Sequence, residues 1–174
     1  MSQSQHVDQV RRSLLGAAAV SIAAGPAAAQ TGVQPTANTT FGPLRRVDAG
    51  VLNIAYAELG PAGGPPIILL HGWPYDIHSY AEVAPLLAAR GYRVIVPHLR
   101  GFGATRFLSD DAIRNGQQSA LGLDVIALMD ALKIERAVLG GFDWGARTVD
   151  IVAALLPGER IGRVAVPEGT SCPA

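Results

Sequence analysis

The sequence predicts an α/β fold built on a doubly wound, mostly parallel sheet with a β-hairpin at its N-terminal end. Three short apolar runs, at residues 65–70, 92–97 and 137–141, have the composition of strands that are buried on both faces. Stretches with helical periodicity separate these runs, and strands that alternate with helices form parallel sheets covered on both sides. Hydrophobic residues make up 49% of the 174 residues and charged residues 16%, a composition that can bury a core.

The first 29 residues resemble a twin-arginine export signal and are predicted to stand outside the fold. Arg11 and Arg12 precede an apolar run that is short for a bilayer span, and a run of small residues ends at Ala29. We therefore expect cleavage after Ala29 and an exported, periplasmic location. Two alternatives stay open: an uncleaved segment, which would be the chain's one contact with a membrane, or a leader without function.

Residues 30–43 are small, polar and rich in Pro and Gly, and they are predicted to be a linker. The α/β domain is predicted to span residues 44–166, and an irregular tail to follow at 167–174. Its first part, residues 44–60, alternates around a turn at 48–50 in the manner of a β-hairpin.

Two helices are predicted between the apolar runs. The first covers residues 79–90 and ends at Gly91, which suits a helix C-terminus, while Pro85 confines its regular part to the second half. The second covers residues 119–132 and carries one apolar stripe. That stripe consists of Leu121, Val125, Leu128 and Leu132.

A third helix and a fourth strand are predicted after the last apolar run. The helix covers residues 146–155 and ends at Pro157 and Gly158, and the strand covers 163–166. The chain contains no internal repeats.

Composition excludes several classes of function. Lys and Arg total 14 and Asp and Glu total 14, so no net charge favours nucleic acid or anionic lipid. Cys172 is the single cysteine, which excludes an internal disulfide and a cysteine-based metal site. His71 and His78 do not have a zinc-binding spacing, and no glycine-rich segment has the spacing of a dinucleotide or phosphate loop. We expect no metal, no cofactor and no nucleic-acid partner, and the sequence leaves the oligomeric state open.

One carboxylate, Asp143, occupies an unusual place between the predicted strand 137–141 and the helix that follows. Gly141 and Gly145 flank it at two residues' distance, and glycines there permit a sharp, strained turn with close backbone approach. Such a turn pushes the central side chain out at the carboxyl end of the sheet, where open parallel sheets bind ligands. The N–H of Trp144, at the helix start, can stabilise an anion. The alternative is an aspartate that merely caps the helix.

A second motif, His71-Gly72-Trp73-Pro74, directly follows the first apolar run. The backbone N–H of Trp73 is predicted to form an oxyanion hole together with that of Trp144, and both tryptophans are predicted to contact the substrate. His71, Gly72 and Pro74 are predicted to shape the loop.

The histidines are interpreted mainly as structural residues. His71 is expected to hold its loop, with a role as general base for Asp143 as the alternative. His78 and His98 are expected to be ordinary loop or surface residues.

Three motifs in this order, "LLHGWP", "VPHLRGFGAT" and "LGGFDWGAR", resemble the α/β-hydrolase fold and, within it, the aspartate-nucleophile branch of epoxide hydrolases and haloalkane dehalogenases. The resemblance runs from Leu44 to Val166. Trp144 suits either activity, whereas the aromatic Trp73 looks more like an epoxide hydrolase, because dehalogenases commonly place a polar residue there. His98 is a departure, since the family often has aspartate before the Arg-Gly pair.

The resemblance implies a mechanism and a substrate class. Asp143 would attack an sp³ carbon of an epoxide, or of an alkyl halide in the dehalogenase alternative, and form an alkyl-enzyme ester. A histidine oriented by an acid would then activate water, and the oxyanion hole would stabilise the intermediate. Tyrosines of a lid domain protonate the opening epoxide oxygen in such enzymes, and the reaction needs no cofactor.

In that family the lid, the acid and the histidine follow the strand after the nucleophile helix, and no residue here matches the histidine. We therefore expect a chain truncated after its nucleophile half, with the lid and last strands missing, unstable alone and without full turnover. Glu168 stands where some dehalogenases keep their acid, but no histidine is present for it to orient. The alternative is a non-catalytic remnant, or a binding module that uses the exposed sheet edge.

Overall fold

The computed structural model describes residues 40–156, 158 and 160–165. The predicted export signal, most of the linker, Pro157, Glu168, Cys172 and the predicted tail lie outside these residues. In the described part, no helix is long and apolar enough to cross a membrane.

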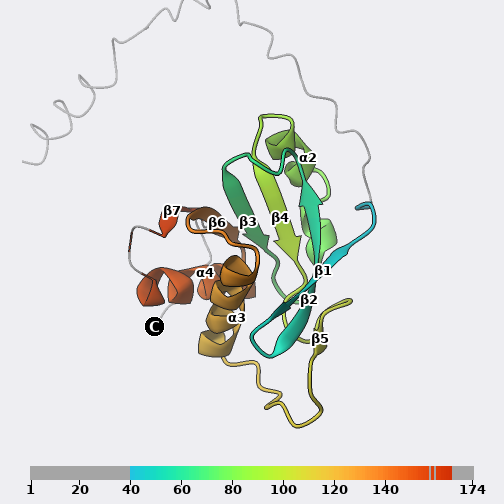
Figure 1. Ribbon diagram of the computed structural model, residues 1–174, viewed down its shortest axis with the longest axis vertical. Coiled ribbons are helices and arrows are strands. Elements are labelled where there is room, and N and C mark those ends of the chain that lie inside the picture. Colours follow the sequence, from blue (N-terminus) through green and yellow to red (C-terminus); the bar gives the residue numbers. More distant parts are fainter. Residues whose placement is uncertain (1–39, 157, 159, 166–174) are drawn as a thin grey trace, which may run out of the picture. The chain divides into compact units, whose positions relative to one another are not determined.

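Strands and helices alternate along the described chain after an initial hairpin (Figure 1). The strands are β1 Arg45–Ala49, β2 Leu52–Leu59, β3 Pro66–Leu70, β4 Arg93–Pro97, β5 Arg106–Phe107, β6 Ala137–Gly141 and β7 Ile161–Ala165. The helices are the 3-10 helix η1 Ile77–Tyr80 and the α-helices α2 Val83–Ala88, α3 Gln118–Ala131 and α4 Trp144–Leu155.

The seven strands form one mixed sheet in the order β1-β2-β4-β3-β6-β7, with β5 paired to β2. The pairs β3–β4, β3–β6 and β6–β7 are parallel, while β2 pairs antiparallel with β1, β4 and β5. The parallel half therefore carries the three apolar runs, and the hairpin extends it on one side, as predicted. The carboxyl ends of β3 and β6 lie side by side, because Leu70 pairs with Gly141.

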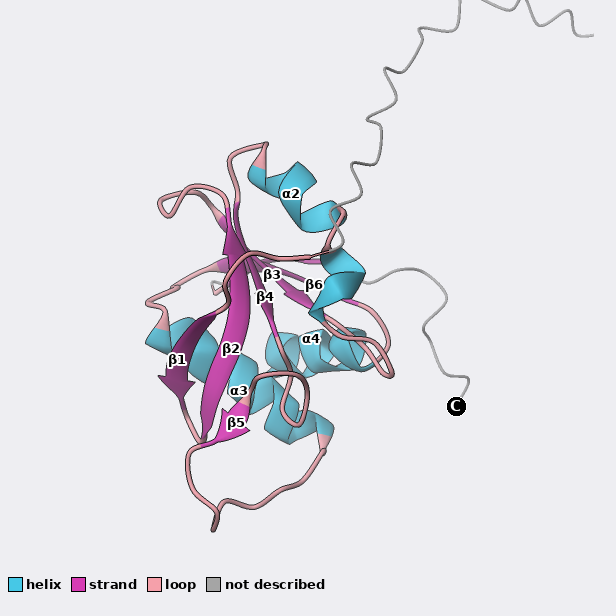
Figure 2. Cartoon of the chain, turned by 90° about the vertical axis from the view of Figure 1, so that its right-hand side faces the viewer, coloured by secondary structure: helices cyan, strands magenta, loops and turns pink. Residues whose placement is uncertain are grey.

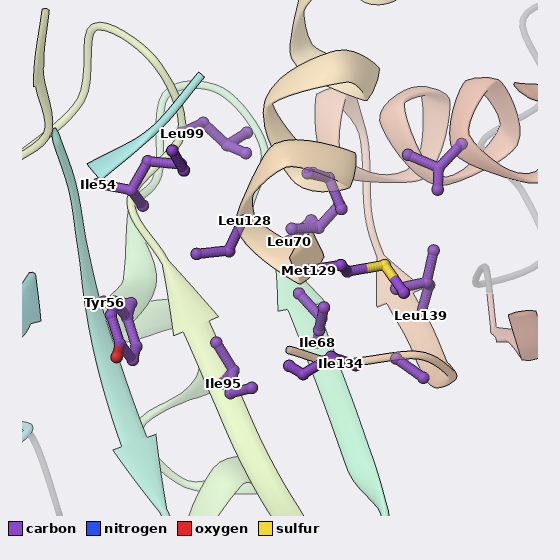
Figure 3. Packing of buried hydrophobic residues seen from close by; sticks show 14 of the residues in the cluster. Ile54, Tyr56, Ile68, Leu70, Ile95, Leu99, Leu128, Met129, Ile134 and Leu139 are labelled. Carbon is purple, nitrogen blue, oxygen red and sulfur yellow. The ribbon is translucent and has the colours of Figure 1, made fainter. Parts of the chain in front are cut away.

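Alternate residues of the central strands point to opposite faces of the sheet. In β3, Ile68 and Leu70 join the larger core cluster with α3 and α4, whereas Ile67 and Leu69 join a second cluster with η1 and α2. Figure 2 shows α3 and α4 together beside the sheet, and Figure 3 shows the larger cluster. A strand buried on both faces needs apolar residues at every position, which is why these runs do not alternate.

The hairpin turns later than predicted. Ala49 still pairs with Leu52, so the turn is made by Gly50 and Val51 rather than by residues 48–50. Gly50 has φ +56, a left-handed conformation that favours glycine in two-residue hairpin turns. The two-residue strand β5 was not predicted, because nothing local distinguishes it from the loop around it.

The predicted helix 79–90 is instead divided into η1 and α2. Asp76 caps η1 by accepting the N–H of His78 at 2.9 Å, which starts helical structure earlier than periodicity indicates. Pro85 lies in the first turn of α2, where no helical N–H is required of it. Gly91 has φ +88 and donates to Ala88 O, as expected of a residue just past a helix.

The remaining elements agree with expectation within a few residues. Helix α3 buries Leu121, Val125 and Leu128 of the predicted stripe, with Leu132 half-buried just past its end. Helix α4 begins at Trp144 and β7 at Ile161, each two residues earlier than predicted.

Candidate active site

Asp143 lies at the junction between β6 and α4, in a strained backbone conformation. Its φ of 50° and ψ of −119° place a non-glycine residue in a region that L-amino acids rarely adopt. The turn is closed on both sides of it, because Gly145 N–H donates to Phe142 O at 2.9 Å and Arg147 N–H donates to Asp143 O at 3.1 Å. The strained turn thus holds the carboxylate at the carboxyl edge of the sheet.

Three glycines make room for this turn. A Cβ at Gly141 would lie 2.5 Å from the carbonyl carbon of Gly145, and a Cβ at Gly145 would collide with the carbonyl oxygen of Leu70. A Cβ at Gly72 would lie 2.6 Å from the Cβ of Asp143. Each neighbour is backbone or the Asp143 side chain itself, so none can move away cheaply.

The side chain of Asp143 is held from the loop after β3. Trp73 N–H donates to Asp143 Oδ1 at 2.9 Å. Asp143 makes no side-chain capping bond to α4, so the capping interpretation is wrong for this aspartate. One carboxylate oxygen is therefore bound by the predicted oxyanion-hole donor, while Oδ2 has no protein partner among the described residues.

Trp144 occupies the first position of α4, where a backbone N–H has no partner within its own helix. Its proposed role as second oxyanion-hole donor stays a prediction, since no described hydrogen bond joins it to Asp143. The peptide bond between Trp73 and Pro74 is cis. Trp73 is 66% exposed and Trp144 37% exposed, so both residues are open to a ligand.

A cavity of about 380 Å³ lies beside the turn that holds Asp143. Its lining is mostly apolar and includes Gly72, Trp73 and Trp144. Gly72 and Trp73 contact Asp143, and Trp144 follows it in the sequence. The other lining residues are Leu99, Arg100, Phe102, Gly116 and Leu121. The segment between β4 and α3 thus forms the wall opposite the two predicted motifs.

Arg100, one of the lining residues, forms a buried ion pair with Asp124 of α3. Arg100 Nε and Nη2 donate to Asp124 Oδ2 and Oδ1 at 2.6 and 2.7 Å, and the side chains are 8% and 11% exposed. Burial raises the pKa of Asp124, against the opposing influence of Arg100. Both carboxyl oxygens accept N–H groups, which is the geometry of an ionised carboxylate.

His71 contacts its own loop and Leu99 through its two ring nitrogens and is not placed as a base. The ring is fully buried, its Nε2 accepts the N–H of Leu99 at 3.2 Å, and its Nδ1 lies 3.3 Å from Gly72 O. These contacts fit a neutral ring that carries its proton on Nδ1. Burial lowers the pKa of His71, which favours the same neutral form. With both nitrogens engaged, His71 has no free atom to activate water.

The prediction that His98 is an ordinary surface or loop residue is wrong. Its ring is 5% exposed, packs against the backbone of Gly103, which has φ +50, and lies 6.3 Å from the His71 ring. Its Nδ1 is buried and has no hydrogen-bond partner among the residues that the structure describes. His98 directly follows β4, and the buried residues of that strand continue past Pro97 to His98 and Leu99. His78, in contrast, is exposed, and its Nδ1 lies 3.0 Å from Asp76 Oδ1.

Sequence reasoning missed three contributors to the site. Asp124 interrupts an apolar helix stripe, a signal that could have paired it with Arg100. Thr105 and Tyr80 had no such signal: Thr105 Oγ1 donates to His98 O at 2.8 Å, and Tyr80 Oη donates to Leu70 O at 2.9 Å. In the described residues, no three His, Cys, Asp or Glu side chains are grouped to hold a metal ion.

Comparison with known proteins places this geometry in a family. The profile described as "alpha/beta hydrolase fold" matches residues 65–169. Epoxide hydrolase A of Mycobacterium tuberculosis is 37% identical over 121 residues, which are 70% of this chain and 37% of that protein. A haloalkane dehalogenase of Mycobacterium marinum is 36% identical over 126 residues, covering 70% of this chain and 40% of that protein.

Solved structures show the same likeness. A crystal structure described as a "putative epoxide hydrolase" from Klebsiella pneumoniae has a TM-score of 0.70 and 58% identity, covering 74% of this chain and 42% of that one. Epoxide hydrolase A from Mycobacterium thermoresistibile has a TM-score of 0.64 and 33% identity, over 71% of this chain and 38% of that one. The chain thus spans about two fifths of the length of these relatives.

Proposed function

The chain belongs to the α/β-hydrolase fold family, and we propose that it supplies the nucleophile and the oxyanion-hole donors of an epoxide-hydrolase-like reaction. The observation that carries the proposal is the strained Asp143, whose Oδ1 accepts the N–H of Trp73 at 2.9 Å. Relatives named epoxide hydrolase support this substrate class. Because the chain spans about two fifths of their length, the proposal rests on the first chemical step.

In that step, Oδ2 of Asp143 attacks an sp³ carbon of the epoxide. The ring C–O bond breaks, its electron pair stays on the ring oxygen, and that oxygen takes up a proton from water. The product is an alkyl-enzyme ester whose carbonyl oxygen is Oδ1. Trp73 N–H already binds this atom and polarises the new carbonyl, and Trp144 N–H is the proposed second donor.

Hydrolysis of the ester needs a general base that removes a proton from water. His71 does not supply it, because both ring nitrogens are engaged within the loop. We therefore expect the ester to form faster than this chain breaks it down, so that the covalent intermediate accumulates.

Intact-protein mass spectrometry after exposure to styrene oxide tests this step. We expect a single adduct with the complete mass of the epoxide, located on Asp143 by peptide mapping, since ring opening retains every atom. Asp143→Asn should abolish it. Asp150→Asn, which changes an exposed carboxylate of the same helix, is the matched control and should retain it. Absence of an Asp143 adduct in a folded sample would contradict the proposal and favour a non-catalytic binding module.

A dehalogenase-like activity is the second candidate, favoured by the haloalkane dehalogenase relative and by Trp144 beside the cavity. Attack on an alkyl halide expels the halide, so the adduct gains the alkyl group without the halogen. Parallel incubations with styrene oxide and 1-bromohexane separate the candidates by which reagent labels Asp143 faster.

We also propose that residues 1–29 direct export to the periplasm through the twin-arginine route. The paired arginines, the mild apolar run and the small residues ending at Ala29 support this. N-terminal sequencing of the periplasmic product should begin at Gln30, and changing Arg11 and Arg12 to lysine should retain the chain in the cytoplasm. Unchanged export by that variant would contradict the twin-arginine route.

A further inference from the structure

Among the described residues that line the cavity beside Asp143, one is charged and the others are apolar. The lining residues other than glycine are Trp73, Leu99, Arg100, Phe102, Leu121 and Trp144. A guanidinium in such a wall would ordinarily attract a carboxylate ligand, because Arg binds carboxylates through paired N–H groups.

Arg100, however, has no donor left to offer. Its five N–H groups face five acceptors: Asp124 Oδ2 from Nε, Asp124 Oδ1 and Ala120 O from Nη2, and Asn115 O and Oδ1 from Nη1. The contacts range from 2.6 Å to 3.5 Å, with the shortest to the carboxylate. The hydrogen-bonding capacity of the guanidinium is thus filled from within the protein.

The charge of Arg100 is compensated as well. Asp124 lies on α3 and accepts N–H groups of the guanidinium with both carboxylate oxygens. Since the two side chains are 8% and 11% exposed, little water screens them and the pair acts on the cavity as a neutral dipole. The carboxylate of Asp143 then remains as a negative charge at the cavity's edge, and it repels anions.

We propose that Asp124 determines the substrate class of this site by neutralising Arg100, so that neutral aryl epoxides enter and carboxylate-bearing ones are excluded. This inference rests on the proposed function of Asp143. The aromatic residues Trp73, Trp144 and Phe102 in the lining favour an aryl group in the cavity. Asp124 is a positioning residue, since it acts through Arg100 and does not itself line the cavity.

The chain contains two tryptophans, and both line this cavity, so intrinsic fluorescence reports on its occupancy. Phenylacetamide and phenylacetate are a matched pair of probes that share a benzyl group and differ in charge. We expect the 174-residue chain to bind the amide at least about 10-fold more tightly than the anion.

Asp124→Asn keeps the side-chain shape but leaves the Arg100 charge uncompensated. We expect phenylacetate affinity to rise by about 10-fold or more and to weaken with added salt, while phenylacetamide affinity changes by less than about 3-fold. A purely structural role for Asp124 would weaken both probes together. Equal binding of both probes by the unchanged chain, or no gain in phenylacetate affinity in Asp124→Asn, would overturn the inference.

A double variant, Arg100→Met with Asp124→Leu, covers the case in which Asp124→Asn does not fold. Buried ion pairs can often be replaced together by apolar residues without loss of stability. This variant should bind phenylacetamide as before and still reject phenylacetate, and gain of phenylacetate binding would contradict the role of Arg100.

The covalent test separates this inference from the proposed function. Adducts on Asp143 should form with styrene oxide and not with a phenylglycidate anion. Equal labelling by both reagents refutes the selectivity and leaves the nucleophile in place. Selective binding of the amide without any adduct refutes the nucleophile and leaves the selectivity in place.

Discussion

At the scale of single residues, the site depends on a backbone conformation that only its neighbours make tenable. Asp143 adopts φ 50° although nothing in an isolated strand–helix junction favours it. Gly141, Gly145 and Gly72 leave space at the points where the turn approaches the rest of the sheet. The Trp73 N–H then binds the carboxylate, which makes no capping bond to the helix terminus.

Gly145→Ala tests this packing. The added methyl group would collide with the carbonyl oxygen of Leu70, which β3 holds in the sheet, so we expect a loss of about 3 kcal/mol or more in the free energy of unfolding. Urea denaturation followed by circular dichroism measures it. Gly63→Ala is the control, because a Cβ there meets no atom within 4 Å, and it should change stability by less than about 1 kcal/mol. Similar values for the two variants would show that the close approach at Gly145 does not limit stability.

At the scale of elements, the segment between β4 and α3 is held in place by the short pairing of β5 with β2 and by side-chain hydrogen bonds. Thr105 Oγ1 accepts the N–H of Ala55 at 3.1 Å and donates to His98 O at 2.8 Å. Leu99 N–H donates to His71, and Arg100 joins the segment to α3. The cavity wall is therefore attached to three elements, β2, the loop after β3 and α3.

Thr105→Val tests this attachment. The substitution keeps the shape but leaves two buried backbone groups without a partner, so we expect a loss of about 2–4 kcal/mol. Thr148→Val is the matched control, because the Thr148 hydroxyl bonds to Trp144 O within its own helix and should cost less than about 1 kcal/mol to remove. Urea unfolding with an unchanged m-value measures both, and equal losses would contradict the role given to Thr105.

At the scale of the whole molecule, two buried histidines link the stability of the fold to pH. Burial lowers the pKa of both His71 and His98. Below pH 6.5, the ordinary histidine pKa, the unfolded chain therefore binds protons that the folded chain does not yet bind. Asp76 opposes this shift at both rings. Because the unfolded state then binds more protons, the contribution of the neutral histidines to the free energy of unfolding is full above pH 6.5. It falls as the pH drops toward the lower pKa values of the folded state.

We therefore expect the Tm to fall by several degrees between pH 7.5 and pH 5.5, roughly 4 °C for each 1 kcal/mol lost. Differential scanning calorimetry at the two pH values measures the difference. His98→Asn should reduce this difference even if it lowers the Tm at both pH values. His78→Gln changes an exposed histidine and should alter this difference less than His98→Asn does. An equal or larger pH dependence in His98→Asn would rule out His98 as a source.

Most of the fold was predictable because burial requires apolar residues at recognisable spacings along the sequence. The runs at β3, β4 and β6 are apolar at almost every position because both faces are covered, and the stripe of α3 repeats with the helical period. Helix starts and the division of residues 79–90 into η1 and α2 were missed, because caps such as Asp76 act through one hydrogen bond rather than through a pattern. The burial of His98 was missed because a histidine carries no local sign of the face it will occupy.

The sequence by itself determined the alternation of strands and helices, the glycines around Asp143 and the loop motif that begins at His71, since these depend on residue type and spacing along the chain. Only the tertiary structure decided that Trp73 N–H, 70 residues away, binds Asp143, that Leu99 engages His71, and that Asp124 neutralises Arg100. Those pairings join segments that meet only when the parallel strands align their carboxyl ends. Their energies depend on distance and burial, which spacing along the sequence does not contain.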